Sequence, residues 1–93
     1  MKLWSVSVDR SSQQLIEWGQ CTIKLRHSAP GATDRYVVEA DDRAIEAVRR
    51  QSGVLSAERA DDGIYYDDSG LVFELSRGGK RWLLLDRVPG PHP

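Results

Sequence analysis

The residues best suited to chemistry form a short basic segment between two apolar runs of the chain. It surrounds the pair Gly78-Gly79 with three cationic side chains, Arg77, Lys80 and Arg81. Such groups on a projecting turn can bind the phosphates of RNA or DNA or the carboxylates of a partner protein, and the adjacent Trp82 can stack on a base. Exposed turns are also polar for reasons unconnected with ligands. This segment, the basic tip, is therefore a candidate binding surface.

Three pairs of adjacent aspartates recur near the expected ends of helices and strands: Asp41-Asp42, Asp61-Asp62 and Asp67-Asp68. Paired carboxylates can bind Ca²⁺ or Mg²⁺, and acidic arrays can imitate a nucleic-acid backbone and occupy a basic groove on another protein. Aspartate is also a preferred residue of helix caps and turns. Because the segment 61–70 lacks the ligand pattern of an EF-hand loop, caps and turns are the favoured role, and we predict no metal or other cofactor.

Covalent catalysis needs a base beside a nucleophile, and the only histidines are His27, at the edge of a loop, and His92, in a proline-rich tail. Cys21 alternates with Ile23 and Leu25 in a strand pattern, so we expect a buried apolar side chain. The sequence contains no Gly-rich loop preceding a helix, which disfavours a nucleotide cofactor. We predict no enzymatic activity. Acid–base chemistry by a carboxylate stays open, with three glutamates to consider: Glu17, Glu39 and Glu74.

Length and composition are those of one small globular domain. The chain has 93 residues, 29% charged and 40% hydrophobic, with a formal net charge of -1, which argues against binding DNA by bulk charge alone. The single cysteine excludes an internal disulfide, and we predict a cytoplasmic protein. The N-terminus alternates polar and apolar residues instead of forming a signal peptide, and no membrane span is expected.

The basic tip would be presented by a β-hairpin built from residues 71–76 and 81–86. Adjacent glycines between strand formers predict a type I′ turn, because that turn needs a positive φ at both central residues. The register that follows pairs Leu75 with Trp82 and Phe73 with Leu84. It directs one apolar face toward the core and leaves the second face, which carries Val72, Glu74, Leu83 and Leu85, partly apolar.

Alternating apolar residues predict further strands over residues 2–8, 20–26, 35–40, 54–59 and 64–66. One helix is expected over residues 42–51, capped by Asp41 or Asp42, with an ion pair between Glu46 and Arg50. A short second helix over residues 12–18 is favoured over a single strand from 14 to 26 bent at Gly19. The last four strands would form an antiparallel meander.

These elements predict a single α+β domain over residues 1–88, mainly antiparallel sheet, followed by a proline-rich tail at 89–93. The segment 44–48, followed by Ser52-Gly53-Val54, resembles the second helix and fourth strand of ferredoxin-like domains. The expected arrangement is therefore a split β-α-β unit with an appended C-terminal hairpin. We carry no function over from this likeness.

The leading functional hypothesis is a small non-enzymatic interaction protein, a regulator or inhibitor that docks on a larger protein; a homodimer is the other assembly considered. Its expected partner-binding residues come from the apolar face, the basic tip and the acidic turns: Tyr65, Tyr66, Leu83, Leu85, Arg77, Lys80, Arg81, Asp61, Asp62, Asp67 and Asp68. One alternative is a module that binds RNA or DNA through Lys24, Arg26 and the basic tip. Another is a small enzyme or ligand-binding domain with a pocket around Cys21 and His27.

Overall fold

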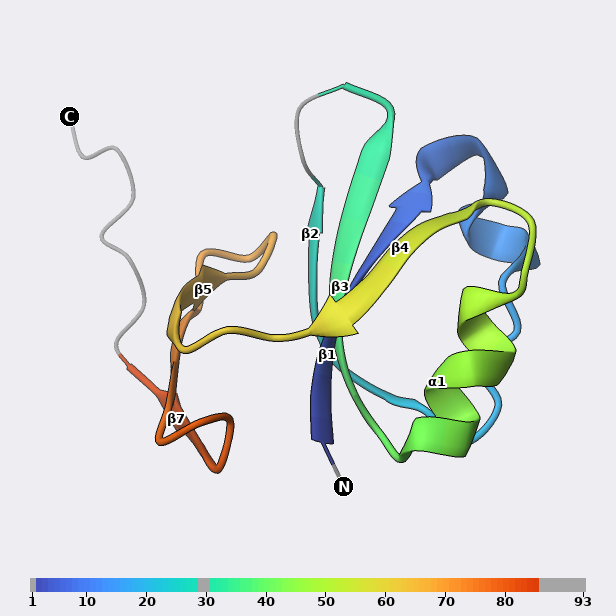
Figure 1. Cartoon of the computed structure of the whole chain (residues 1–93). Coiled ribbons are helices and arrows are strands. Elements are labelled where there is room, and N and C mark those ends of the chain that lie inside the picture. The colour runs from blue at the N-terminus through green and yellow to red at the C-terminus, as the bar shows by residue number, and fades with distance from the viewer. Residues whose placement is uncertain (1, 29–30, 86–93) are drawn as a thin grey trace, which may run out of the picture. The chain divides into compact units, whose positions relative to one another are not determined.

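The computed structural model describes residues 2–28 and 31–85. The chain divides into two units, Met1–Ala60 and Asp61–Pro93, each with its own antiparallel sheet. Among the described residues there is one α-helix, so the predicted α+β class with mostly antiparallel strands is confirmed (Figure 1). The boundary between the units falls inside the domain predicted for residues 1–88, and the predicted tail at 89–93 lies outside the described residues.

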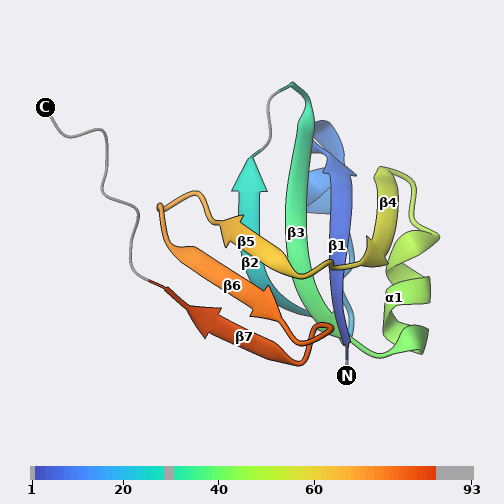
Figure 2. The same ribbon diagram turned by 60° about the vertical axis from the view of Figure 1, so that its left-hand side comes forward.

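The first unit contains four strands in the order β2-β3-β1-β4, with antiparallel neighbours throughout. They are β1 (Lys2–Asp9), β2 (Thr22–Ser28), β3 (Thr33–Ala40) and β4 (Val54–Arg59). Because β1 lies between β3 and β4 and is antiparallel to both, β3 and β4 run in the same direction. The helix α1 (Asp42–Arg49) connects them across one face of the sheet (Figure 2).

The core of this unit lies between that face of the sheet and α1. Alternate residues of β1 and β3 point into it, as the period-2 pattern predicted, and α1 contributes Ile45 and Val48. The inward residues of the two strands are Trp4, Val6, Val8, Tyr36, Val38 and Ala40. The Trp4 indole N–H donates to the carbonyl of Ala40 over 3.0 Å, so the largest core side chain keeps its polar group paired.

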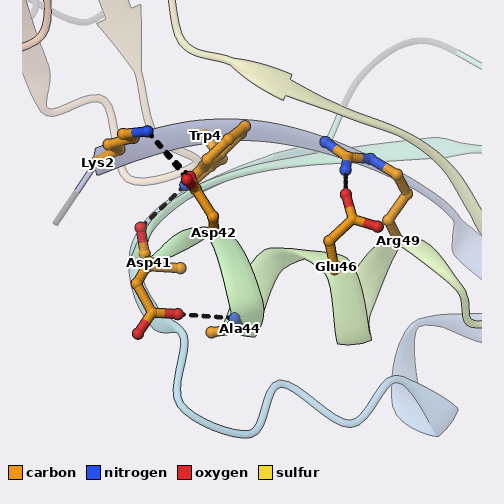
Figure 3. A network of polar contacts seen from close by, with 8 residues as sticks. Lys2, Trp4, Asp41, Asp42, Ala44, Glu46 and Arg49 are labelled. Carbon is orange, nitrogen blue, oxygen red and sulfur yellow. Dashed lines mark hydrogen bonds and ion pairs between the residues drawn. The ribbon is translucent and has the colours of Figure 1, made fainter.

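Helix α1 begins as predicted, because the Asp41 carboxylate accepts the backbone N–H of Ala44 over 2.7 Å (Figure 3). It ends at Arg49, two residues before the predicted end. The expected ion pair between Glu46 and Arg50 was wrong, since Glu46 contacts Arg49 instead. Arg49 is held there by a 2.7 Å hydrogen bond to the carbonyl of Ala57 in β4.

The segment after β1 is neither the α-helix predicted over residues 12–18 nor the single strand predicted over residues 14–26. A 3₁₀-helix, η1 (Arg10–Leu15), begins earlier than the expected α-helix, and the chain turns extended at Ile16. The extended backbone lets Ile16 enter the core, and the Trp18 ring packs on Tyr36 at a centroid distance of 4.8 Å. A continued α-helix would have grouped Trp18 with Leu15, which is 76% exposed.

The sequence predicted that Cys21, Ile23 and Leu25 would share one buried face. The structure differs in strand β2. The pairing with β3 shifts between Ile23 and Leu25, and this irregularity reverses the alternation. Leu25 is buried, whereas Ile23 is 43% exposed.

The second unit is a meander of three strands: β5 (Gly63–Tyr66), β6 (Val72–Ser76) and β7 (Arg81–Leu84). The hairpin register is confirmed, with Leu75 opposite Trp82 and Phe73 opposite Leu84. The predicted fourth strand of this meander was wrong, because β4 pairs with β1 in the first sheet, where Ala57 lies opposite Val6 in the core.

Gly53 allows η1 to approach the end of α1 closely. It has a φ of +94°, and a Cβ added there would lie 2.5 Å from the Cβ of Ser12. We expect Gly53→Ala to lower the free energy of unfolding by about 2 kcal/mol or more, because it combines backbone strain with a clash. Urea denaturation measures the loss.

Gly19→Ala is the matched control for this effect. Gly19 also has a positive φ, +57°, but nothing lies within 4 Å of an added Cβ. Backbone strain alone should cost about 1 kcal/mol. Equal losses in the two variants would show that the approach of Ser12 is unimportant.

Candidate functional site

One side of the second sheet carries exposed apolar side chains on its two outer strands, β5 and β7. Ile64 lies opposite Glu74 and Glu74 opposite Leu83; one row along, Tyr66 lies opposite Val72, whose carbonyl accepts the N–H of Leu85 over 2.8 Å. The exposed fractions of Ile64, Tyr66 and Leu83 are 48%, 50% and 38%. We call this side of the sheet the Leu83 face and define it by these residues: Ile64, Tyr66, Val72, Glu74, Leu83 and Leu85. On the central strand, Val72 is buried, at 8% exposed, and Glu74 is charged.

Tyr65 does not belong to the Leu83 face, although the sequence analysis had placed it beside Tyr66. Neighbouring residues of a strand point to opposite sides, and Tyr65 pairs with Phe73 on the other side of the sheet. Its hydroxyl donates to the carbonyl of Asp61 over 2.5 Å. Ile64 takes its place on the Leu83 face, and the same alternation could have identified it.

Trp82 is engaged within its own sheet. Its ring stacks on Phe73 at a centroid distance of 5.1 Å and an interplanar angle of 16°, and it packs against Tyr65 at 5.8 Å. The stack on Phe73 occupies one face of the ring on which a nucleic-acid base would otherwise stack.

The basic tip contains Gly78 and Gly79 with φ of +66° and +85°, as the predicted turn requires. The preceding Arg77 also has a positive φ, +59°, which the sequence did not indicate. The carboxylate of Asp62 accepts the backbone N–H groups of both glycines, each over 2.9 Å. One acidic pair and the basic tip, predicted as separate features, therefore meet in one place.

The other acidic pairs act mainly as caps and turns. The Asp67 carboxylate accepts the N–H groups of Ser69 and Leu71 over 2.9 and 3.0 Å, while Asp68 is exposed in the same turn. Asp42 forms a 3.0 Å ion pair with Lys2 (Figure 3). Among the residues that the structure describes, no three carboxylate, histidine or cysteine side chains could hold a metal ion together.

The cations proposed for nucleic-acid binding are distributed over both units. Lys24 and Arg26 belong to β2 in the first unit, and the basic tip belongs to the second. Lys24 lies 3.8 Å from Glu39, and Arg26 lies 3.3 Å from Asp34.

Asp34 is a buried carboxylate that the sequence analysis missed. It is 0% exposed, and it binds Arg10 Nε over 2.9 Å and Arg26 Nη2 over 3.3 Å. Arg10 also donates to the carbonyl of Thr33 over 3.2 Å, so the cluster joins η1, β2 and β3. The sequence could have indicated its burial, because Asp34, one residue before the predicted strand, lies on the same side as Tyr36 and Val38.

The surroundings of Cys21 bear on the alternative of a small enzyme with a pocket around Cys21 and His27. Burial raises the pKa of the Cys21 thiol, and the negative charge of Asp41 raises it further, so the nucleophilic thiolate is disfavoured. A concavity of about 250 Å³ opens beside α1, where Trp18, Ala44 and Ala47 supply part of its lining. Neither Cys21 nor His27 is among its lining residues, so it is not the pocket that the enzyme hypothesis required.

The Asp34 cluster makes folding dependent on pH. Burial alone would raise the pKa of Asp34, but hydrogen bonds and positive charge from Arg10 and Arg26 outweigh burial and lower it below 3.8. The ionised carboxylate therefore contributes stability that is present above the ordinary pKa and is lost as the pH falls through the lower, folded-state value.

We expect Asp34→Asn to lower the free energy of unfolding at pH 7 by about 2 to 3 kcal/mol, because two cations lose a charged acceptor. The difference from the parent chain should shrink as the pH falls below 4, which urea titrations at several pH values would measure. Asp42→Asn is the control, since it removes an exposed carboxylate paired with Lys2 and should cost less than about 1 kcal/mol. A difference that persists unchanged at low pH would contradict the assignment.

No helix within residues 2–28 and 31–85 combines the length and apolar character needed to cross a membrane. Comparisons with protein-family models, with curated proteins and with solved structures find no match.

Proposed function

We propose that the chain is a small non-enzymatic interaction protein that docks on a larger protein through the Leu83 face. The observation that carries this proposal is the exposure of Ile64, Tyr66 and Leu83 on one side of a single sheet. Fully burying a large apolar side chain is favourable by roughly 1.5 to 3 kcal/mol, and each of these half-buried side chains would supply part of that amount. Three partly exposed side chains of this size can form the centre of an interface.

Charges around the Leu83 face would orient the partner. Glu74 lies between Ile64 and Leu83 in one cross-strand row, and Arg81 lies two residues before Leu83 on β7, opposite Ser76. The turn that carries Asp67 and Asp68 follows Tyr66 at the other end of the strands. At the end of the basic tip, three cations outnumber the two carboxylates of Asp61 and Asp62, whereas the turn of Asp67 and Asp68 is acidic. This difference favours one docking orientation over its reverse, so we propose a partner with the complementary arrangement.

A role in regulation or inhibition is the finer form of this proposal. It rests on the same surface, because occupying a partner through an apolar face needs no catalytic group on this chain. We also propose that the first unit is a ferredoxin-like domain with its first helix reduced to η1. The strand order β2-β3-β1-β4 and the position of α1 between β3 and β4 support that interpretation.

Substitution on the exposed face tests the docking role. We expect Leu83→Asp to weaken capture of a protein partner at least tenfold, because it places a charge in the apolar centre of the interface. Affinity purification from the native host, followed by a binding titration with the purified partner, measures the loss.

Leu55→Asp provides the matched control for this experiment. Leu55 is an equally large, 61% exposed side chain on β4, outside the Leu83 face. The proposal requires that this variant keep the partner. Equal binding by the parent chain, Leu83→Asp and Leu55→Asp would show that the Leu83 face is not part of the interface. Co-purification of nucleic acid that is lost at higher salt would favour the alternative function, binding of RNA or DNA.

A further inference from the structure

The basic tip has the backbone geometry of an anion-binding site. Arg77, Gly78 and Gly79 follow one another with positive φ, and the N–H groups of the two glycines point to the same carboxylate. Successive amides that converge in this way create a concave region of positive potential. The turn therefore recognises an oxyanion through its main chain, apart from any side-chain charge.

The side chains of the tip strengthen that preference. Arg77, Lys80 and Arg81 are exposed within the same turn and its first following residue, and Asp62 is the anion that the backbone holds. Three positive charges face two negative charges, those of Asp62 and its neighbour Asp61, which leaves a local excess of one positive charge. An oxyanion carrying two charges would therefore bind more favourably than a carboxylate with one.

We propose that the basic tip is a binding site for a phosphate-type oxyanion, and that Asp62 is an intramolecular occupant that the oxyanion displaces. Asp62 is exposed, so the exchange needs no opening of a core. The carboxylate lies 16 residues from Gly78 in the sequence, which makes it a tethered competitor with a high effective concentration. Free oxyanion then binds the parent chain weakly and binds more tightly once the competitor is removed.

Titration with inorganic phosphate tests this site directly. The backbone amide signals of Gly78 and Gly79 are followed by NMR while ionic strength is held constant with sodium chloride. In Asp62→Asn we expect saturable shifts of both signals with a dissociation constant at least tenfold lower than in the parent chain. Acetate, which carries one charge, should bind more weakly than phosphate.

Asp61→Asn distinguishes the loss of the hydrogen-bonding carboxylate from the loss of a nearby negative charge. It removes the same negative charge one residue earlier, whereas the hydrogen bonds to the glycines come from Asp62. This variant should bind phosphate as the parent chain does, within about twofold. An equal gain in both variants would show that only long-range charge matters and would overturn the assignment of Asp62 as occupant.

The parent chain supplies a second test that does not depend on the variant folding. At high phosphate concentration the Asp62 carboxyl carbon should shift together with the Gly78 and Gly79 amides, because the same exchange moves all three. Signals from Leu75 and Trp82, which pair across the hairpin, confirm that the turn stays formed. Failure of phosphate to shift the glycine amides in both the parent chain and a folded Asp62→Asn would overturn the proposal.

Discussion

The first unit depends on β1, which is hydrogen-bonded along both of its edges. Its neighbours β3 and β4 are each antiparallel to it, so the segment that joins them has to cross a face of the sheet, and α1 is that crossing. Trp4, Val6 and Val8 then point from β1 toward the helix. Trp4 also lies beneath the guanidinium groups of Arg49 and Arg59, at 5.9 and 5.5 Å from the ring centroid. A single central strand thus positions the helix, the core and much of the surrounding charge.

The second unit gathers its aromatic contacts on one side of a small sheet, although Leu84 on that same side is 54% exposed. Phe73, Trp82 and Tyr65 pack together on one side, and the Leu83 face is on the other. The hairpin that presents both sides is closed by backbone conformation and by the carboxylate of Asp62. The apolar surface and the anion-binding turn belong to the same three strands, although different groups form them.

The alternation of apolar and polar residues predicted a strand correctly where its pairing with the neighbouring strand is regular. The inward residues of β1 and β3 and the register around Gly78 were of this kind. Predictions failed where distant contacts decide the conformation. The η1 segment is fixed by the approach of Gly53 to Ser12 and by the Gln51 side chain, which bonds both main-chain groups of Glu17 over 2.8 and 2.6 Å. The binding of Asp62 to the basic tip likewise joins positions that no short motif connects.

The edge strands of the two sheets affect whether a strand from another copy of this chain can pair with them. In the second sheet β5 and β7 contain four residues each, and β7 begins with the cation Arg81. In the first sheet β2 carries the irregularity after Ile23, and β4 ends in Glu58 and Arg59. Short, irregular and charged borders are poor templates for adding a further strand. Edge-to-edge association of copies through either sheet is therefore disfavoured, even though the Leu83 face of the second sheet carries exposed apolar side chains.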